Sequence, residues 1–243
     1  LLTAIFGIIN WYDKKDFKSI LLIIICFYVA SVFHGATIVG LFVFFVMFLL
    51  YNTQLSINLL KKKIIDLKII LFFILFFILI YLYASGIIKF SYLGSFQESI
   101  SFNNLQVVID TRMKGNASYP EWTRINSIYD FLYKLPARML YFLLSPFPWD
   151  IERPIHLLGL LDSFFHFILI ILIIKNRNEI WKQPALRLIL LILIIYFIVF
   201  SLGVSNFGTG IRHRSKFVIG LILLAGPLLP KLVILKKKLI NLY

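Results

Sequence analysis

Long apolar runs alternate along the chain with short polar stretches that are rich in lysine. The runs cover about 20–33, 35–51, 69–88, 155–174, 186–204 and 217–235. Most of them come close to the roughly 18–20 consecutive apolar residues with which one helix crosses a bilayer core. The pattern predicts an all-α fold: a polytopic helical membrane protein with about six transmembrane segments.

Residues 20–51 form one apolar block that is interrupted by the polar stretch "SVFHGAT". As a single helix the block would be about 48 Å long, whereas a hydrocarbon core is about 30 Å thick. Two short crossings, or a re-entrant hairpin, with a tight turn at His34–Gly35 are one solution, and one long tilted helix is the other. Lysines flank the block at 10–19 and at 52–68, and short basic loops prefer the cytoplasm. This charge pattern favours two crossings or a re-entrant hairpin.

Alternation across the membrane then assigns the remaining segments. It divides the chain into N-terminal transmembrane helices (1–88), a long external segment (89–154) and C-terminal transmembrane helices (155–243). The basic loop at 175–187 is expected inside and the loop at 205–216 outside. The chain begins with Leu1, and "LLTAIFGII" is expected to be the tail of a truncated helix.

Composition supports the membrane interpretation. Hydrophobic residues make up 60% of the chain and the mean hydropathy is +0.92, whereas soluble domains are about 45–50% apolar. A net charge of +14 could indicate nucleic acid. Because the lysines cluster at the ends of apolar runs, the positive-inside pattern explains most of them, and the predicted partner is the lipid bilayer rather than nucleic acid. The single cysteine, Cys26, permits no intramolecular disulfide.

The external segment contains an amphipathic stretch, Ser127–Leu144, with apolar and aromatic residues at helical spacing. Asp130, Lys134 and Arg138 follow at i, i+4 and i+8 and so share one face. The spacing predicts an interfacial helix that lies on the outer leaflet. The following "SPFPWD" contains two prolines, which exclude regular helix, and Trp149 suits a membrane interface.

The stretch "SNFGTGIRHRSK" (205–216) is expected outside, yet it is strongly basic. One reason would be a phosphate site, in which Arg212 and Arg214 offer planar forks and His213 a proton. Gly208 and Gly210 would permit positive φ and let backbone N–H groups approach the anion. The alternatives are nonspecific contact with lipid head groups by snorkelling side chains and a reversed topology.

Asp162 and His166 lie four residues apart in the middle of an apolar run. Ionisable groups at that depth are candidates for function, here as a proton relay or to orient a neighbouring helix. A buried, purely structural pair is the alternative, and the same two readings apply to His34. No spacing in the sequence matches a metal site or a nucleotide-binding motif, so no metal or cofactor is predicted.

Three short stretches occur together: "FHGA" (33–36), "SPFPW" (145–149) and "NFGTGIRHR" (206–214). The set, about 18 of the 243 residues, resembles bacterial integral membrane proteins of surface-polysaccharide synthesis, close to the O-antigen polymerases. The resemblance implies an inverting glycosyl transfer at the outer face of the inner membrane. The substrate would be an undecaprenyl-pyrophosphate-linked glycan.

Such proteins hold pyrophosphate with arginines of two external loops. The resemblance implies that role for Arg212 and Arg214, with Arg112 or Arg124 as counterparts. A base would take the proton from the attacking sugar hydroxyl; the candidates are Asp110, Glu121 and His213. Polymerases of this group usually have ten or more helices, and a truncated start would account for the difference. Two rival functions remain: a lipid-dependent membrane glycosyltransferase, and a non-enzymatic flippase or permease component that uses Asp162 and His166.

Overall fold

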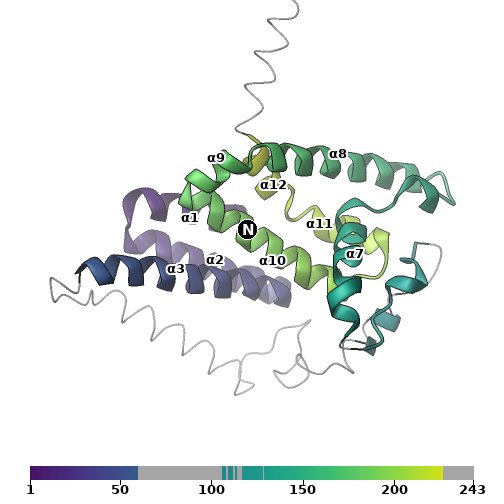
Figure 1. Cartoon of the computed structure of the whole chain (residues 1–243), viewed down its shortest axis with the longest axis horizontal. Coiled ribbons are helices and arrows are strands. Elements are labelled where there is room, and N and C mark those ends of the chain that lie inside the picture. The colour runs from purple at the N-terminus through teal and green to yellow at the C-terminus, as the bar shows by residue number, and fades with distance from the viewer. Residues whose placement is uncertain (60–105, 108, 112, 114–116, 128, 227–243) are drawn as a thin grey trace, which may run out of the picture. The chain divides into compact units, whose positions relative to one another are not determined.

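The computed structural model describes residues 1–59, 106–107, 109–111, 113, 117–127 and 129–226 (Figure 1). The predicted crossing at 69–88, the end of the last apolar run and Arg112 lie outside these residues. Within them the regular structure is helical, apart from one isolated β-bridge between Ser118 and Asn206. The all-α prediction is therefore confirmed for the described part of the chain. The chain divides into two compact units at residues 104–105.

The first unit contains α1 (Leu2–Lys14), α2 (Phe17–Phe33), the 3₁₀ turn η1 (Gly35–Thr37) and α3 (Ile38–Leu59). Helix α2 begins at Asp16, whose Oδ1 accepts a hydrogen bond from the Ser19 N–H at 3.3 Å. It ends at His34, whose extended backbone (φ −152°, ψ 97°) breaks the helix. Helices α2 and α3 pack against each other. The predicted break at His34–Gly35 is confirmed, and a single long helix is excluded.

An aromatic cluster forms the core of the first unit. The Trp11 ring lies 5.7 Å from that of Phe44 and 5.3 Å from that of Phe48, between ring centroids. Gly7 allows α1 to approach α2 closely, because a Cβ at this position would lie 2.8 Å from Cγ1 of Ile23. Helix α1 is thus packed on both members of the α2–α3 hairpin.

The second unit is built around two long apolar helices that run in opposite directions, α8 (His156–Lys175) and α10 (Pro184–Gly203), joined by the short α9 (Arg177–Lys182). Helix α12 (Val218–Ala225) packs on both of them. Figure 1 shows α9 at one end of α8 and α10, and α7 (Asp130–Leu144) and α11 (Phe207–Arg214) at the other end. The remaining elements are the 3₁₀ turns η3 (Glu121–Thr123) and η4 (Pro148–Asp150).

Helices α8 and α10 have 20 residues each, which gives each a length of about 30 Å. By length and composition, they are the two helices among the described residues that could cross a membrane. Helix α2 and residues 35–49 of the first unit are apolar but shorter. The described structure thus contains two of the roughly six predicted crossings at full length, and these two favour membrane association.

Helix α8 has its polar residues inside and its apolar residues outside. His156, Ser163 and His166 are buried, whereas Leu158 and Leu161 are 65% and 67% exposed. In a water-soluble protein the exposed face would be polar. The inverted distribution is typical of a helix whose outer face meets lipid and whose ionisable groups face the protein interior.

Helix α7 confirms the predicted amphipathic helix but corrects the direction of its charged face. Arg138 is fully buried and Asp130 is 6% exposed, while Tyr133 and Leu140 on other faces are 65% and 54% exposed. The helix packs on α8, α10 and α11, so its charged row points into the second unit rather than toward head groups. The reason is that Arg138 finds its hydrogen-bonding partners on the neighbouring segments.

Candidate functional site

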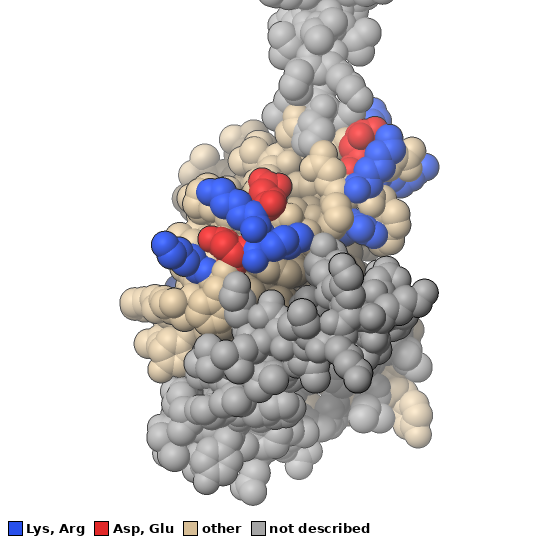
Figure 2. Space-filling view, turned by 90° about the vertical axis from the view of Figure 1, so that its left-hand side faces the viewer, with Lys and Arg blue, Asp and Glu red and all other residues tan. Residues whose placement is uncertain are grey.

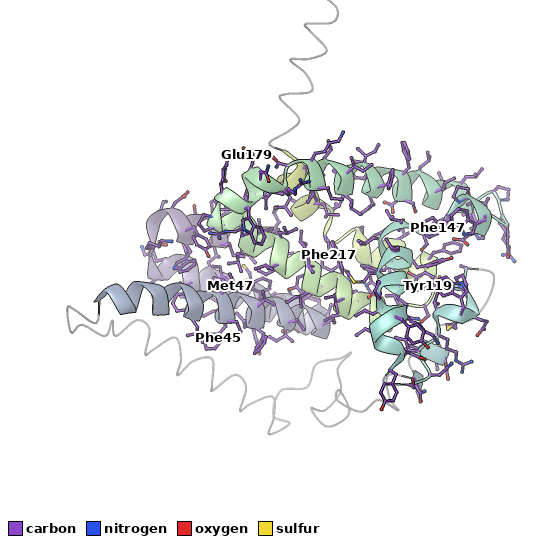
Figure 3. The ribbon with its side chains drawn as sticks, in the orientation of Figure 1. Phe45, Met47, Tyr119, Phe147, Glu179 and Phe217 are labelled. Atoms are coloured by element: carbon purple, nitrogen blue, oxygen red, sulfur yellow. The ribbon has the colours of Figure 1, made fainter. Side chains whose placement is uncertain are left out.

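The candidate site is a polar cap on the end of the second unit opposite α9, made by residues 117–127, 129–155 and 204–216. A short backbone bridge joins its segments: the Tyr119 N–H donates to the Ser205 carbonyl and the Phe207 N–H to the Ala117 carbonyl, both at 2.9 Å. Figure 3 shows Tyr119 and Phe147 at this end of the unit, beside α7. The segments predicted to share one face of the membrane therefore lie together.

The basic stretch at 206–214 is a helix, not an open loop. Asn206 begins α11 by accepting hydrogen bonds at its Oδ1 from the N–H groups of Gly208 (2.8 Å) and Thr209 (3.4 Å). The Gly210 N–H donates to the Asn206 carbonyl at 2.9 Å, and both glycines have helical backbone. The expected glycine cradle for an anion is thus not formed, because these N–H groups are used by the helix itself.

Gly210 has a packing role instead. A Cβ at this position would lie 3.0 Å from the hydroxyl oxygen of Tyr119 and 3.9 Å from the Phe142 carbonyl oxygen. Tyr119 is 2% exposed, and burial raises the pKa of its phenol above the ordinary value. A neutral tyrosine therefore fills the space that the glycine leaves on α11.

Arg214 is fully buried at the centre of the cap. Its Nε donates to Oδ2 of Asp162 at 2.7 Å, and its Nη2 donates to Oγ of Ser163 at 2.9 Å, so it binds α8. Its Nη1 donates to the carbonyls of Ser145 (2.6 Å), Leu143 (3.0 Å) and Phe142 (3.4 Å) at the end of α7. All three nitrogens of the guanidinium are therefore engaged inside the protein.

These contacts give Arg214 a structural role. The last four carbonyls of a helix have no partner within the helix, and a buried helix end without partners is costly. Arg214 supplies such partners to α7 while the Asp162 carboxylate balances its charge. Burial lowers the pKa of the Arg214 guanidinium, and Asp162 opposes that shift. In this arrangement Arg214 has no donor turned toward an external phosphate.

Arg138 makes the same kind of connection from α7 to the end of α10. Its guanidinium donates to the carbonyls of Ser201 (3.0 Å), Leu202 (3.1 Å) and Val204 (2.8 Å), and to Oγ of Ser205 (3.0 Å). The positive charge faces the negative end of the α10 dipole. Burial lowers the pKa of Arg138 to about 10, so the side chain stays charged at neutral pH.

Sequence reasoning missed this role of Arg138. The signal was present, since Asp130, Lys134 and Arg138 form a charged row on one face. Periodicity identifies such a face but does not say whether it points outward or inward. Asp130 and Lys134 are paired at 3.0 Å, and the Asp130 carboxylate also accepts the Asn126 N–H at 2.6 Å. The whole row is therefore used for internal bonding.

Among the predicted phosphate ligands, Arg212 is the one on α11 that is exposed. Arg124, in the cap, pairs with Asp110 at 2.8 Å, and both side chains are more than 40% exposed. In this pair the charge of Asp110, a candidate base, is balanced by the charge of Arg124, a candidate phosphate ligand. Arg212 takes part in no ion pair among the described residues, so its charge is available at the surface.

The two other candidate bases lie in different surroundings. Glu121 is the first residue of η3 and is exposed. His213 is 7% exposed; its ring packs 5.3 Å from Phe200, and its Nδ1 lies 3.1 Å from Nζ of Lys216. Burial lowers the pKa of Lys216, with the neighbouring Arg212 charge as a smaller cause. Glu121 is therefore the more accessible of the two.

The predicted association of Asp162 and His166 is present. Nδ1 of His166 lies 2.8 Å from the Asp162 carbonyl oxygen and 3.5 Å from its Oδ1. Nε2 of His166 is buried without a hydrogen-bonding partner among the described residues. Because the Asp162 carboxylate also binds Arg214, this part of α8 is joined to α11.

The end of the second unit at α9 also carries basic and polar side chains, but they do not form a cluster like the polar cap. Asn176 closes it by donating from Nδ2 to the Leu224 carbonyl at 2.9 Å, and Lys182 pairs with Glu179 at 3.0 Å. Figure 2, which views the side that lies at the left of Figure 1, shows separate groups in which acidic and basic side chains lie next to one another. No group of three potential metal ligands occurs in the described part of the chain.

A scan against protein-family models, a search of curated proteins and a search of solved structures each found no match to this chain.

Proposed function

We propose that this chain is part of a multi-pass protein of a bacterial inner membrane that acts in surface-polysaccharide synthesis. It polymerises or transfers an undecaprenyl-pyrophosphate-linked glycan at the outer face. One observation carries the proposal: two of the stretches on which the resemblance rests meet in the polar cap. Arg214 of "NFGTGIRHR" donates to the carbonyl of Ser145 in "SPFPW" at 2.6 Å, although 69 residues separate them.

The charges at the two ends of the second unit support the orientation. Residues 175–187 hold Lys175, Arg177, Lys182 and Arg187 in a short connection, which favours the cytoplasmic side. Helix α8 leads into this connection and α10 leads out of it, so their other ends, at the polar cap, share one side. In the proposed orientation this is the outer side. A lipid-linked pyrophosphate meets the protein there, at the level of the head groups.

The arginines differ in their contacts. Arg138 binds carbonyl groups at the end of α10, and Arg214, on α11, binds those at the end of α7. Arg212, exposed on the same helix, is the proposed ligand of the pyrophosphate and stabilises the charge that develops as it leaves. Glu121, the exposed carboxylate of η3, is the proposed base for the attacking sugar hydroxyl.

Replacement of Arg212 by alanine in the full-length protein tests this proposal. The readout is the length of the surface polysaccharide in cells that depend on the gene, with the amount of protein in the membrane measured in parallel. Arg153→Ala is the matched control, because Arg153 is another exposed arginine of the polar cap. We expect short or unpolymerised glycan with Arg212→Ala alone. Long chains of normal abundance with that variant would refute the proposal.

A non-enzymatic flippase or permease component is a second candidate, favoured by Nε2 of His166 in α8, which has no hydrogen-bonding partner within the described part of the chain. A carrier of this kind would use His166 or Asp162 to couple movement to protons. The Arg214–Asp162 ion pair opposes this function, since the carboxylate already has a cation. If His166→Leu traps lipid-linked glycan on the cytoplasmic side, the permease function is correct and the polymerase is not.

A further inference from the structure

Two tryptophans of the polar cap are exposed to an unusual degree, Trp149 at 73% and Trp122 at 58%. A chain of ring contacts joins them. Trp122 packs on Tyr141 with ring centroids 6.0 Å apart, Tyr141 on Phe147 at 5.1 Å, and Phe147 on Trp149 at 4.8 Å. These four residues form a continuous row of ring contacts, exposed at its two tryptophans and buried at Tyr141, which we call the aromatic platform.

The aromatic platform is held in a defined shape. The rings of Phe147 and Trp149 are almost parallel, at 9°. Around them the Phe147 N–H donates to Oδ2 of Asp150 at 2.8 Å, and the Asp150 N–H donates to the Phe147 carbonyl at 2.9 Å. Tyr141, on α7, is 9% exposed and anchors the centre. A ligand that stacks here therefore costs little side-chain entropy, since the rings are already ordered.

Charged residues of both signs are close in sequence to the two tryptophans. Glu121 precedes Trp122 and Arg124 follows it, and Asp150, Glu152 and Arg153 follow Trp149. Glu121, Glu152 and Arg153 are exposed, and the Arg124 side chain is 41% exposed. Carboxylates accept hydrogen bonds and guanidinium groups donate them, so these surroundings favour a neutral, hydroxylated ligand.

A sugar ring has this chemistry. Its axial C–H groups make an apolar face that stacks on the electron-rich face of an aromatic ring. Its hydroxyl groups lie around the edge and donate hydrogen bonds to carboxylate oxygens. Flat exposed rings with carboxylates at their border are complementary to both parts. A simple hydrophobic contact would need no carboxylates.

We propose that the aromatic platform binds sugar rings of the glycan. This inference rests on the proposed function and adds the saccharide to the pyrophosphate as a recognised part of the substrate. The platform and α11 are parts of one packed structure, because Tyr119 contacts both. Its ring centroid lies 5.3 Å from that of Tyr141, and its hydroxyl lies against Gly210. Arg212 and the platform are therefore held by the same polar cap.

Glycan binding by the full-length protein in lipid nanodiscs tests the inference. The probe is the oligosaccharide pool that mild acid releases from the lipid-linked glycans of cells carrying the gene. Trp149→Ala and Trp122→Ala are compared with Trp181→Ala, a control on α9 that is 61% exposed at the opposite end. We expect the dissociation constant to rise about tenfold for the first two variants and to stay unchanged for the control. Unchanged affinity in both cap variants would overturn the inference.

Nanodiscs with brominated lipids provide a second measurement on the same proteins. The chain has four tryptophans, so the Trp149 signal is the part of the fluorescence that Trp149→Ala removes. If head-group-level bromines quench this part and the oligosaccharide does not relieve the quenching, the aromatic platform is a membrane anchor and the inference is overturned. Relief of quenching, or none at the start, supports it. If Arg212→Ala shortens the polymer while the tryptophan variants bind glycan normally, the inference fails alone. If the tryptophan variants lose binding while Arg212→Ala keeps long chains, the proposed function fails alone.

Discussion

Replacing Arg214 with alanine measures how much one buried arginine of the polar cap contributes to the unfolding free energy. The substitution removes the cation that the Asp162 carboxylate faces at 2.7 Å. It also removes the donors to the Leu143 and Ser145 carbonyls and to the Ser163 hydroxyl. Alanine reaches none of these groups, so the end of α7 and the middle of α8 lose their shared partner.

The size of the effect follows from the contacts. Arg214 donates five hydrogen bonds, and bonds inside membrane proteins average roughly 0.6 kcal/mol each, which gives about 3 kcal/mol. Removing one partner of a buried ion pair costs about 3–5 kcal/mol. Asp162 is 30% exposed, so solvent screens part of the lost attraction. We expect the unfolding free energy to fall by about 3 kcal/mol.

The measurement is reversible unfolding of the full-length protein in mixed micelles, followed by helix content. Arg212→Ala is the matched control: this neighbouring arginine is exposed, and its removal should change the unfolding free energy by less than about 0.5 kcal/mol. The pair Arg214→Met and Asp162→Leu should recover much of the loss, because no uncompensated charge then remains. If Arg214→Ala is as stable as Arg212→Ala, the structural role assigned to Arg214 is wrong.

Two further predictions concern the same unit. Hydrogen bonding, mainly from the Tyr133 hydroxyl, lowers the pKa of Asp130 below the ordinary value of 3.8. Asp130 therefore contributes its full stability above that value, and the contribution decreases as the pH falls below it toward the folded-state pKa. In Asp130→Asn the unfolding free energy should therefore depend less on pH between about pH 5 and 3. Gly159→Ala should cost about 1–3 kcal/mol in the micelle assay, because its Cβ would lie 3.0 Å from the rigid Pro146 ring. Gly226→Ala is its control, since none of the residues that the structure describes lies within 4 Å of a Cβ at that position, and equal stability of the two variants would contradict the packing argument.

The amino-acid sequence by itself determined where the long apolar helices and α7 lie, although it did not predict α11. The apolar runs at 155–174 and 186–204 agree within two residues with α8 and α10. The polar interruption marked the break at His34–Gly35. Helical spacing identified α7 and placed Asp162 next to His166. All of these depend on residues close together in the chain, where composition and the 3.6-residue period act directly.

The tertiary structure alone decided which charges are inside. The partners of Arg138 at and just after the end of α10 are 63–67 positions away, and Asp162 is 52 positions from Arg214. Local periodicity cannot specify such pairs. Periodicity also shows only that a helix has a polar face, not where this face points. The polar face turns inward when neighbouring segments offer unpaired helix-end carbonyls and the outer side of the helix meets an apolar environment. For this reason Arg212 and Arg214, two residues apart, differ in their contacts: one side chain is exposed, and the other joins α11 to α7 and α8.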